Sequence, residues 1–320
     1  MRDNSSPLVS VVTPTYNRAN TLPRLWQSLR AQRLARFEWL VVDDGSTDNT
    51  QAVVAKWMAE DSRIRYIRHD TNQGVNKSRQ TGSECAAAPY IVFIDSDDAL
   101  FDEETLGLMY SEIVAAPAKV GAVCFAAVYD DGRPACYIAH HKLTLHYEDV
   151  ICDNLARGEF LFICRREYLE SSPWSPYRVL EQWHHYARAR HYDVMFVRRP
   201  AQIVYSDGGC RLSDPDNVFR YSDVYHGLLE MIDQHGDTWL KHCPQRYHYY
   251  QFMVALYAVL AGNVRLARSY ALNALRGGYP IWKVGAVIFC SFIPASWRKA
   301  LFRLWATKLR ARLTHTEPAR

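Results

Sequence analysis

The first 95 residues alternate four times between a short apolar run and a segment with helical spacing, and this alternation constrains the fold most. The apolar runs predict buried strands at 8–13, 37–42, 64–68 and 90–94. Strands that alternate with helices over short connections indicate a parallel sheet covered by helices. We therefore expect an α/β fold with a mostly parallel sheet.

Polar residues follow three of these predicted strands at the point where each strand ends. They lie at 13–17, 43–46 and 95–98. One polar strand end is typical of an ordinary turn, but the carboxyl ends of parallel strands share one edge of a sheet, where ligands of open α/β sheets bind. Three such clusters on one edge predict a binding site.

The last cluster, D-S-D-D at 95–98, carries three carboxylates at the end of a buried strand. Burying like charges together is costly unless a cation lies between them. Oxygen ligands suit Mg²⁺ or Mn²⁺, and such an ion commonly binds a phosphate as well. The alternative is an acidic turn that water solvates.

The second half predicts further strands and then a helical region. Strands at 120–129 and 135–139 are joined by Asp130-Asp131-Gly132, which favours a hairpin, and a helix is expected at 181–190. Helices are expected from about residue 221. Two of them, at 247–261 and 264–275, resemble one tetratricopeptide-like hairpin.

Basic residues concentrate near the C-terminus. Residues 241–320 contain 13 Lys and Arg and one acid, whereas residues 1–240 contain 25 Lys and Arg and 33 acids. Residues 297–313 read as a basic amphipathic helix with two tryptophans, which is typical of contact with an anionic membrane surface. The alternative is a terminal helix docked on the protein. We expect no nucleic-acid partner.

The chain shows no sequence signal for export or for crossing a membrane. Its N-terminus lacks an apolar signal segment, and eight cysteines are scattered without a Cys-x-x-Cys pair, which favours reduced thiols. The apolar run at 284–293 is much shorter than the roughly 20 residues that span a bilayer. We expect a cytoplasmic protein, peripheral on the inner face of the cytoplasmic membrane.

Four stretches, in this order, resemble the glycosyltransferase family 2 enzymes. They are V-S-V-V-T-P-T-Y-N-R at 9–18, L-V-V-D-D-G-S-T-D-N-T at 40–50, N-Q-G-V-N-K-S-R-Q-T-G at 72–82 and F-I-D-S-D-D at 93–98. The resemblance is strong over about the first 100 residues and weak to about residue 210. It implies a Rossmann-like GT-A domain at 1–220 that binds a nucleotide sugar and carries the catalysis. The helical pattern after it predicts an extension at 221–320 that includes the basic amphipathic helix.

The resemblance also implies the residues that hold the donor. Thr13, Pro14 and Tyr16 would line the base pocket. Asp43 would accept a hydrogen bond from a base N–H, and Arg79 would lie near the nucleotide.

Three more donor and metal contacts follow from the resemblance. Asp95 and Asp97 match the DXD pair, which binds Mn²⁺ or Mg²⁺ and, through the metal, the donor diphosphate. Arg211 resembles a residue of the loop that closes over the donor phosphates.

The catalytic base is implied less directly. The family often places it in a Glu-Asp pair at the start of a helix, and the matching pair here is Glu181-Gln182. We expect Glu181 to take the proton of the acceptor hydroxyl. His184 and His185 are the alternative bases. If Glu181 is not catalytic, it is an ordinary glutamate in the first turn of a helix, where the helix dipole stabilises a negative charge.

The expected function is inverting, metal-dependent glycosyl transfer in cell-surface polysaccharide or lipopolysaccharide biosynthesis. The donor would be a UDP-, GDP- or dTDP-sugar, and the acceptor a saccharide or a lipid-linked saccharide. One alternative is a sugar nucleotidyltransferase, but the glycine-rich basic loop that it needs is absent at 14–20. The other is a catalytically degenerate adaptor, which Gln182 supports.

Overall fold

A computed structural model describes residues 6–152, 155–175, 177, 181–205, 221–294 and 297–298, without the side chains of 181 and 182. The chain divides into two compact units. One contains residues 1–175 and 184–209, and the other residues 176–183 and 210–320. The division into a catalytic domain and an extension at residue 220 stays a prediction.

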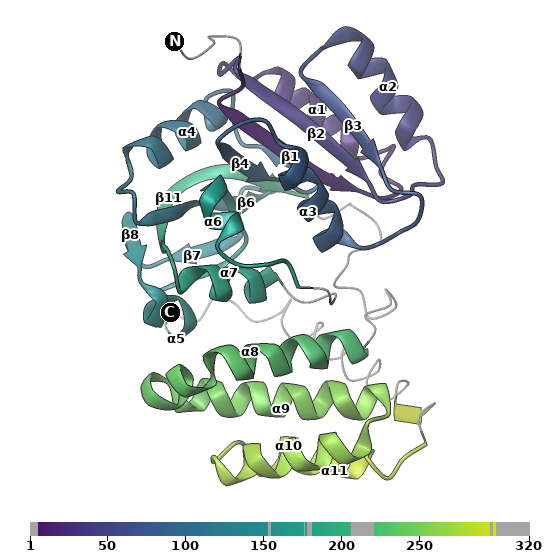
Figure 1. Cartoon of the computed structure of the whole chain (residues 1–320), viewed down its shortest axis with the longest axis vertical. Helices are drawn as coiled ribbons and strands as arrows, with labels where there is room; N and C mark the ends of the chain where they lie inside the picture. Colours follow the sequence, from purple (N-terminus) through teal and green to yellow (C-terminus); the bar gives the residue numbers. More distant parts are fainter. Residues whose placement is uncertain are drawn as a thin grey trace. The chain divides into compact units, whose positions relative to one another are not determined.

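The first unit begins with the predicted alternation of strands and helices. The elements are β1 (Val9–Thr15), α1 (Leu22–Arg30), β2 (Phe37–Asp43), α2 (Thr50–Glu60), β3 (Ile64–Arg68), α3 (Val75–Cys85) and β4 (Tyr90–Phe93) (Figure 1). β1 lies between β2 and β4, β3 flanks β2, and all these pairs are parallel. The carboxyl ends of four strands therefore meet at one edge, as expected.

The rest of this unit makes the sheet mixed. Its elements are β5 (Ala99–Leu100), α4 (Thr105–Ala115), β6 (Val120–Tyr129), β7 (Cys136–Ile138), β8 (Lys142–Leu145), α5 (Tyr147–Cys152), β9 (Ala156–Gly158), β10 (Phe160–Arg165), α6 (Arg166–Glu170), α7 (Glu181–Ala189), of which residues 181–183 belong to the other unit, and β11 (Asp193–Val204). Nine of the described strands form one sheet in the order β3-β2-β1-β4-β10-β6-β11-β5, with β8 paired to β11. β10 is antiparallel to both neighbours, and β11 is parallel to β6.

The hairpin expected after residue 120 forms only in part. The chain turns at Gly132, where φ is 84°, but β7 then pairs with β9 in a separate two-stranded sheet. β6 meets the returning strand through one bridge between Val128 and Pro134. The sequence predicted both strands but not that β7 pairs with β9, because β9 lies about 20 residues further along the chain.

Apolar side chains cover both faces of the large sheet. One face packs against α1, α2 and α4, and the other against α3 and α6. Trp26, Trp39 and Trp57 stack with ring centroids 5.5–6.0 Å apart on the first face. Helices on both faces explain why the first strands read as continuous apolar runs.

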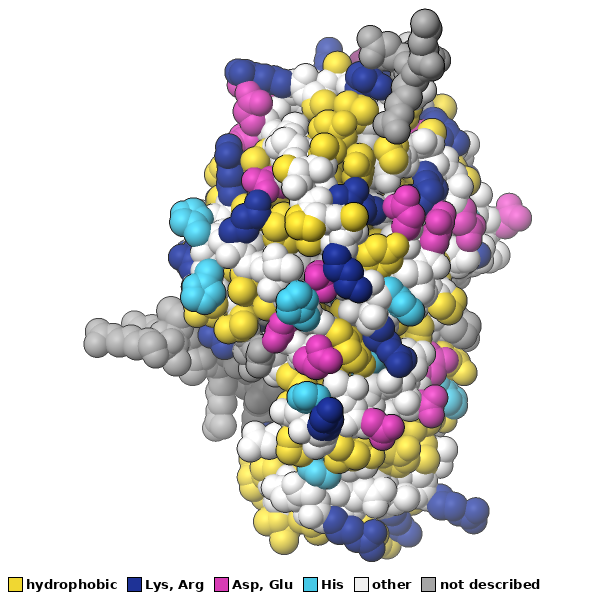
Figure 2. Space-filling model, turned by 60° about the vertical axis from the view of Figure 1, so that its left-hand side comes forward, with side chains coloured by type: hydrophobic (Ala, Val, Ile, Leu, Met, Phe, Trp, Pro, Cys, Tyr) yellow, Lys and Arg dark blue, Asp and Glu magenta, His cyan; other side chains and the backbone are white. Residues whose placement is uncertain are grey.

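The second unit is helical in its described residues. It contains α8 (Tyr221–His242), α9 (Pro244–Ala261), α10 (Val264–Arg276) and α11 (Ile281–Cys290), which share one apolar core. Gly262, with φ 93°, ends α9, and Asn263 caps α10 by accepting a hydrogen bond from Leu266 N at 3.2 Å. Hydrophobic and basic side chains lie together at the lower end of Figure 2, where Figure 1 shows α10 and α11.

Some expectations about the C-terminus and the cysteines can be compared with the described residues. No described helix combines the length and the apolar character needed to cross a membrane. The amphipathic helix expected at 297–313 lies outside the described residues apart from 297 and 298. The expectation of reduced thiols holds for five cysteines and is wrong for Cys152 and Cys243, which are disulfide-bonded; the free thiols are Cys85, Cys124, Cys136, Cys164 and Cys290.

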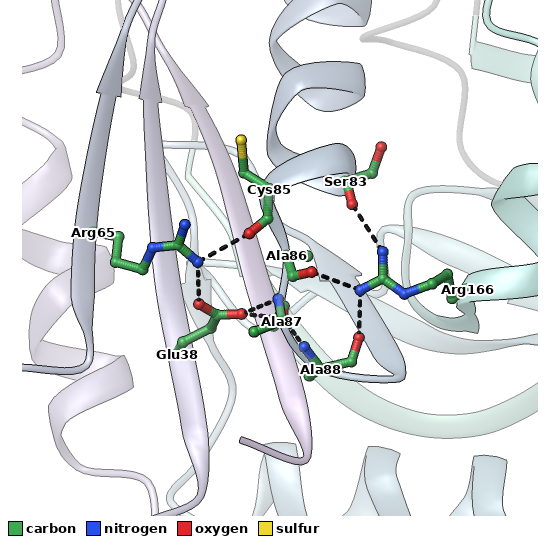
Figure 3. A network of polar contacts seen from close by, with 9 residues as sticks. Glu38, Arg65, Ser83, Cys85, Ala86, Ala87, Ala88 and Arg166 are labelled. Atoms are coloured by element: carbon green, nitrogen blue, oxygen red, sulfur yellow. Dashed lines mark hydrogen bonds and ion pairs between the residues drawn. The ribbon is translucent and has the colours of Figure 1, made fainter. Parts of the chain in front are cut away.

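A polar network holds the segment between α3 and β4 at the amino ends of the strands (Figure 3). The buried carboxylate of Glu38 accepts hydrogen bonds from Ser10 Oγ at 2.6 Å, Ala87 N and Arg65 Nη1 at 2.8 Å. Arg65 also donates to Cys85 O at 2.9 Å. Burial alone would raise the pKa of Glu38, but these hydrogen bonds and the charge of Arg65 outweigh burial and hold it below its usual range.

Arg166 completes this network from the other side (Figure 3). Its guanidinium donates to Ser83 O at 3.2 Å and to Ala86 O and Ala88 O, each at 2.7 Å. These carbonyls include some that the end of α3 leaves without a helical partner, so a cation here is stabilising.

We predict that Glu38→Gln lowers the free energy of unfolding at pH 7 by about 1–3 kcal/mol, because a charged acceptor of several hydrogen bonds is lost. Since the folded-state pKa of Glu38 is lowered, its stabilisation is present above the unfolded pKa and disappears as pH falls through the folded one. The difference between variant and wild type should therefore shrink below about pH 4. Urea unfolding between pH 7 and pH 3 measures it.

The matched control is Glu103→Gln, because Glu103 pairs with Arg33 while both side chains are more than half exposed. This change should cost less than about 1 kcal/mol. Equal effects of the two substitutions would contradict the role given to the buried network.

Candidate active site

β1 runs through Pro14 and brings its polar end to the edge of the sheet. Pro14 lacks an N–H, and the pairing of β1 with β4 stops at Val12, so the strand loses no hydrogen bond there. Thr13 is fully buried, and its Oγ1 accepts a hydrogen bond from Trp39 Nε1 at 2.9 Å. Tyr16, by contrast, is 44% exposed. Of these expected base-pocket residues, Tyr16 offers its side chain to a ligand and Thr13 directs its hydroxyl into the core.

Thr15 is a polar group that the sequence did not single out. It is 3% exposed, and its Oγ1 has no hydrogen-bond partner. A buried hydroxyl without a partner is costly in a folded protein. Its position at the end of β1 makes it a candidate contact for a bound ligand.

Asn17 joins the loop after β1 to the loop after β2. Its φ is 54°, a left-handed conformation that asparagine tolerates better than most residues. Its backbone N–H donates to Ser46 Oγ at 2.8 Å, and its Oδ1 accepts from Thr47 N at 2.8 Å. The polar clusters at 13–17 and 43–46 are therefore joined by hydrogen bonds.

Asp43 and Asp44 are both buried at the end of β2. Asp43 accepts hydrogen bonds from Ser46 N at 2.8 Å and from the Tyr66 hydroxyl. Burial and this contact with Asp43 raise the pKa of Tyr66. A carboxylate has about four acceptor positions, so Asp43 keeps capacity for a further donor.

Asp44 fixes the approach to α3. Its carboxylate accepts from His69 Nδ1 and Gln73 N, each at 2.9 Å, and from Gly74 N at 2.7 Å. Gly74, with φ 96°, is the residue that precedes the first turn of α3. One buried side chain thereby sets where α3 begins.

α3 lies unusually close to the sheet and presents Arg79 to the acidic cluster. A Cβ on Gly82 would come within 2.3 Å of Val12 Cγ1, so a glycine is required for this approach. Arg79 Nη2 contacts Asp95 Oδ1 at 3.1 Å, and the Arg79 side chain is only 11% exposed. The structure therefore brings together Arg79 and Asp95, which the sequence had implicated separately.

Asp98 differs from the other two carboxylates of the acidic cluster because it is buried. The Asp95 side chain is 54% exposed and that of Asp97 is 21% exposed, whereas Asp98 is buried. Burial, and then the negative charges of Asp95 and Asp97, raise the pKa of Asp98 to about 8. Asp98 accepts from Gln202 Nε2 and from Tyr205 N at 3.3 Å, so it joins the end of β11 to the acidic loop.

Asp95 and Asp97 fit a divalent cation that is shared with a phosphate. No group of three or more His, Cys, Asp or Glu side chains among the described residues could hold a metal ion by itself. Magnesium is commonly held by one or two carboxylates together with substrate phosphates and water, and two accessible carboxylates agree with that kind of site. Burial is the main cause of the raised pKa of Asp98, and the negative charges of Asp95 and Asp97 add to it.

Two arginines near this cluster were not predicted as site residues. Arg18 Nη2 lies 3.7 Å from Asp97 Oδ2. Arg24 donates to Asp97 O at 3.2 Å, and its guanidinium lies 3.6 Å from the centroid of the Tyr205 ring. Arg18 ends the motif quoted at 9–18, but Arg24 has no motif that would single it out.

For the candidate base, Glu181, the structure describes only the backbone. Glu181 is the first residue of α7, and its side chain and that of Gln182 lie outside the described part. Burial, followed by the charges of Arg188, His185 and Arg79, lowers the pKa of His184 to about 2. An imidazole with so low a pKa is a weak proton acceptor, which disfavours His184. Arg211 also lies outside the described residues.

Residues 10–165 match the family described as Glycosyl transferase family 2. This part of the chain belongs to that family. The chain is 28% identical over 148 residues to the teichuronic acid biosynthesis glycosyltransferase TuaG of Bacillus subtilis, covering 46% of this chain and 58% of TuaG. It is 34% identical over 104 residues to a GalNAc(5)-diNAcBac-PP-undecaprenol β-1,3-glucosyltransferase of Campylobacter jejuni, covering 32% and 34%. The chain thus spans less than two thirds of these curated relatives.

Two solved structures share the fold over most of the chain. S. aureus TarS 1–349 in complex with UDP-GlcNAc has a TM-score of 0.58 at 18% identity, covering 88% of this chain and 83% of TarS. The mannosyltransferase PcManGT of Pyrobaculum calidifontis, in complex with GDP-Man and Mn²⁺, has a TM-score of 0.52 at 18% identity, covering 95% and 88%. These matches confirm the predicted GT-A fold class.

We predict that Asp44→Asn loosens the start of α3, because the amide has one acceptor oxygen where the carboxylate uses two. Hydrogen exchange at the Gln73 and Gly74 amides should accelerate at least tenfold, and the free energy of unfolding should fall by about 1–3 kcal/mol. Asp70→Asn, in the same loop but exposed, is the control and should change neither value. Unchanged exchange in Asp44→Asn would show that Asp44 does not set the beginning of α3.

Proposed function

We propose that this family 2 glycosyltransferase transfers a sugar from a nucleotide-sugar donor to a saccharide or lipid-linked acceptor, with inversion, in cell-surface polysaccharide or lipopolysaccharide assembly. The observation that carries the proposal is the meeting of three motifs at one sheet edge. Asp43 ends β2, the Asp95–Asp98 loop follows β4 at the same edge of the parallel strands, and Arg79 of α3 pairs with Asp95.

The nucleoside would bind at the ends of β1 and β2. Asp43 has acceptor capacity left for a base N–H, and Thr15 offers a buried hydroxyl that has no partner in the described structure. Tyr16 is exposed enough to lie against a base. Pro14 and Thr13 would shape the floor of this pocket through their backbone. The donor would carry UDP, GDP or dTDP.

The diphosphate would bind at the Asp95–Asp97 side of the edge. A Mn²⁺ or Mg²⁺ ion held by Asp95 and Asp97 would offset the charge that develops on the leaving nucleoside diphosphate. Arg79 pairs with Asp95 in this structure and would also contact the donor phosphates. Arg211 would contact the phosphates from its own loop. Arg18 and Arg24 position Asp97 through its carboxylate and its carbonyl.

The acceptor hydroxyl must lose a proton as its oxygen attacks the anomeric carbon. We assign this step to Glu181, at the first turn of α7, in preference to His184. A lipid-linked acceptor would place the enzyme on the inner face of the cytoplasmic membrane, and the undecaprenol in the name of the Campylobacter relative supports this class of acceptor.

We predict that Asp97→Asn, or Asp95→Asn, lowers glycosyl transfer about 100-fold because the metal loses a charged ligand. Isothermal titration of UDP, GDP and dTDP with Mn²⁺ should identify one nucleotide whose affinity falls by a similar factor in these variants. Asp130→Asn, an exposed acid elsewhere in this unit, is the control and should bind as the wild type does. If no nucleotide sugar is bound or hydrolysed with or without metal, the proposed enzyme is wrong and the degenerate adaptor is favoured.

We predict that Glu181→Gln slows transfer by roughly 10²–10⁴-fold while leaving donor affinity unchanged, since the amide cannot accept the proton. Single-turnover transfer and nucleotide titration separate the two effects. Glu170→Gln, exposed at the end of α6, is the matched control. Transfer at the wild-type rate in Glu181→Gln would assign the base to another residue.

A further inference from the structure

α11 presents an apolar face outward. Val284 and Val287 are buried against the rest of the helical unit, whereas Ile281 and Trp282 are 71% and 68% exposed, and Phe289 is 67% exposed. Positions 285 and 286, on the same outward face, are glycine and alanine. Surface helices normally direct charged or polar residues outward, whereas α11 is apolar on its exposed side as well as on its buried side.

The apolar surface continues beyond the end of α11. Phe292 and Trp297 are 71% and 67% exposed, so four large aromatic side chains lie within 16 residues of one another. Space is open at Gly285, where an added Cβ would meet no atom within 4 Å. Contiguous exposed apolar surface usually marks a contact with a partner or a membrane.

Basic side chains lie directly beside these aromatic rings. Lys283 Nζ is 5.3 Å from the centroid of the Trp282 ring, and the Arg268 guanidinium is 4.2 Å from that of Phe292. The exposed residues of the neighbouring α10 include Arg265 and Arg276. Among residues 241–320 the one acid is Glu317. An aromatic surface bordered by cations, almost without acids, is complementary to an anionic interface.

We propose that the outward face of α11, formed by Ile281, Trp282 and Phe289 and extended by Phe292, docks on an anionic lipid bilayer. Tryptophan and phenylalanine favour the boundary between headgroups and acyl chains, and long basic side chains reach from there to phosphates. A protein partner is less well matched, because the excess of positive charge lacks the mixed signs of most protein interfaces. The inference deepens the proposed function by naming a membrane-contact surface, yet lipid binding is measurable without catalysis.

Vesicle flotation of the full-length chain tests the proposal. The wild type should bind vesicles containing phosphatidylglycerol and bind phosphatidylcholine vesicles weakly. Trp282→Ser/Phe289→Ser should weaken binding to the anionic vesicles at least tenfold, because the two largest inserted side chains are lost. Arg265→Gln/Arg276→Gln should weaken it by about fivefold per charge and reduce its salt dependence.

Two controls make the result specific. Tyr137→Ser/Leu240→Ser removes two large side chains, 49% and 45% exposed, that lie outside α11, and should bind vesicles as the wild type does. Hydrolysis of a soluble nucleotide sugar should be unchanged in every variant, so failed docking and failed catalysis can be told apart.

Three results would overturn the proposal. One is wild-type binding by Trp282→Ser/Phe289→Ser. The second is a wild type that binds no anionic vesicle but self-associates in solution through α11, as detected by sedimentation. The third is loss of binding only in Trp305→Ser/Leu309→Ser, which would move the contact to the C-terminal segment.

Discussion

The geometry of the site depends on the hydrogen bonds that the buried carboxylate of Asp44 accepts. This carboxylate holds His69, Gln73 and Gly74 by hydrogen bonds of 2.7–2.9 Å and so determines where α3 starts. A buried carboxylate is tolerated only when its oxygens are satisfied, which makes the position of this loop highly specified. Because α3 then lies against the sheet through Gly82, Arg79 reaches Asp95.

At the opposite edge of the sheet, a buried carboxylate is again satisfied by several hydrogen bonds. There Glu38 and Arg166 satisfy backbone groups between α3 and β4. The two ends of α3 are thus fixed by buried charges, one at each edge. Such double anchoring leaves the helix little freedom to shift Arg79 away from the acidic loop.

Three arginines contact the acidic loop, and one of its three carboxylates is buried. Arg18, Arg24 and Arg79 contact Asp97 or Asp95, while Asp98 is kept buried with a pKa raised to about 8. Asp98 stabilises the loop from behind by joining it to β11, more than 100 residues away in the sequence.

The sequence by itself determined the alternation of the first strands and helices, the polar strand ends and the family motifs, because burial period and motif order are local properties. It also implicated Asp43, Arg79, Asp95 and Asp97 before any contact was known. It did not reveal that Thr13 turns its hydroxyl to Trp39, or that Asp98 binds Gln202, because those partners lie far along the chain.

The direction in which α11 faces was decided only by the tertiary structure. The apolar run that contains it looks uniform in the sequence, and packing on the rest of the helical unit buries Val284 and Val287 while leaving Trp282 and Phe289 outside. Composition shows that a segment is apolar, but only the packing of its neighbours decides which of its side chains remain available to a membrane.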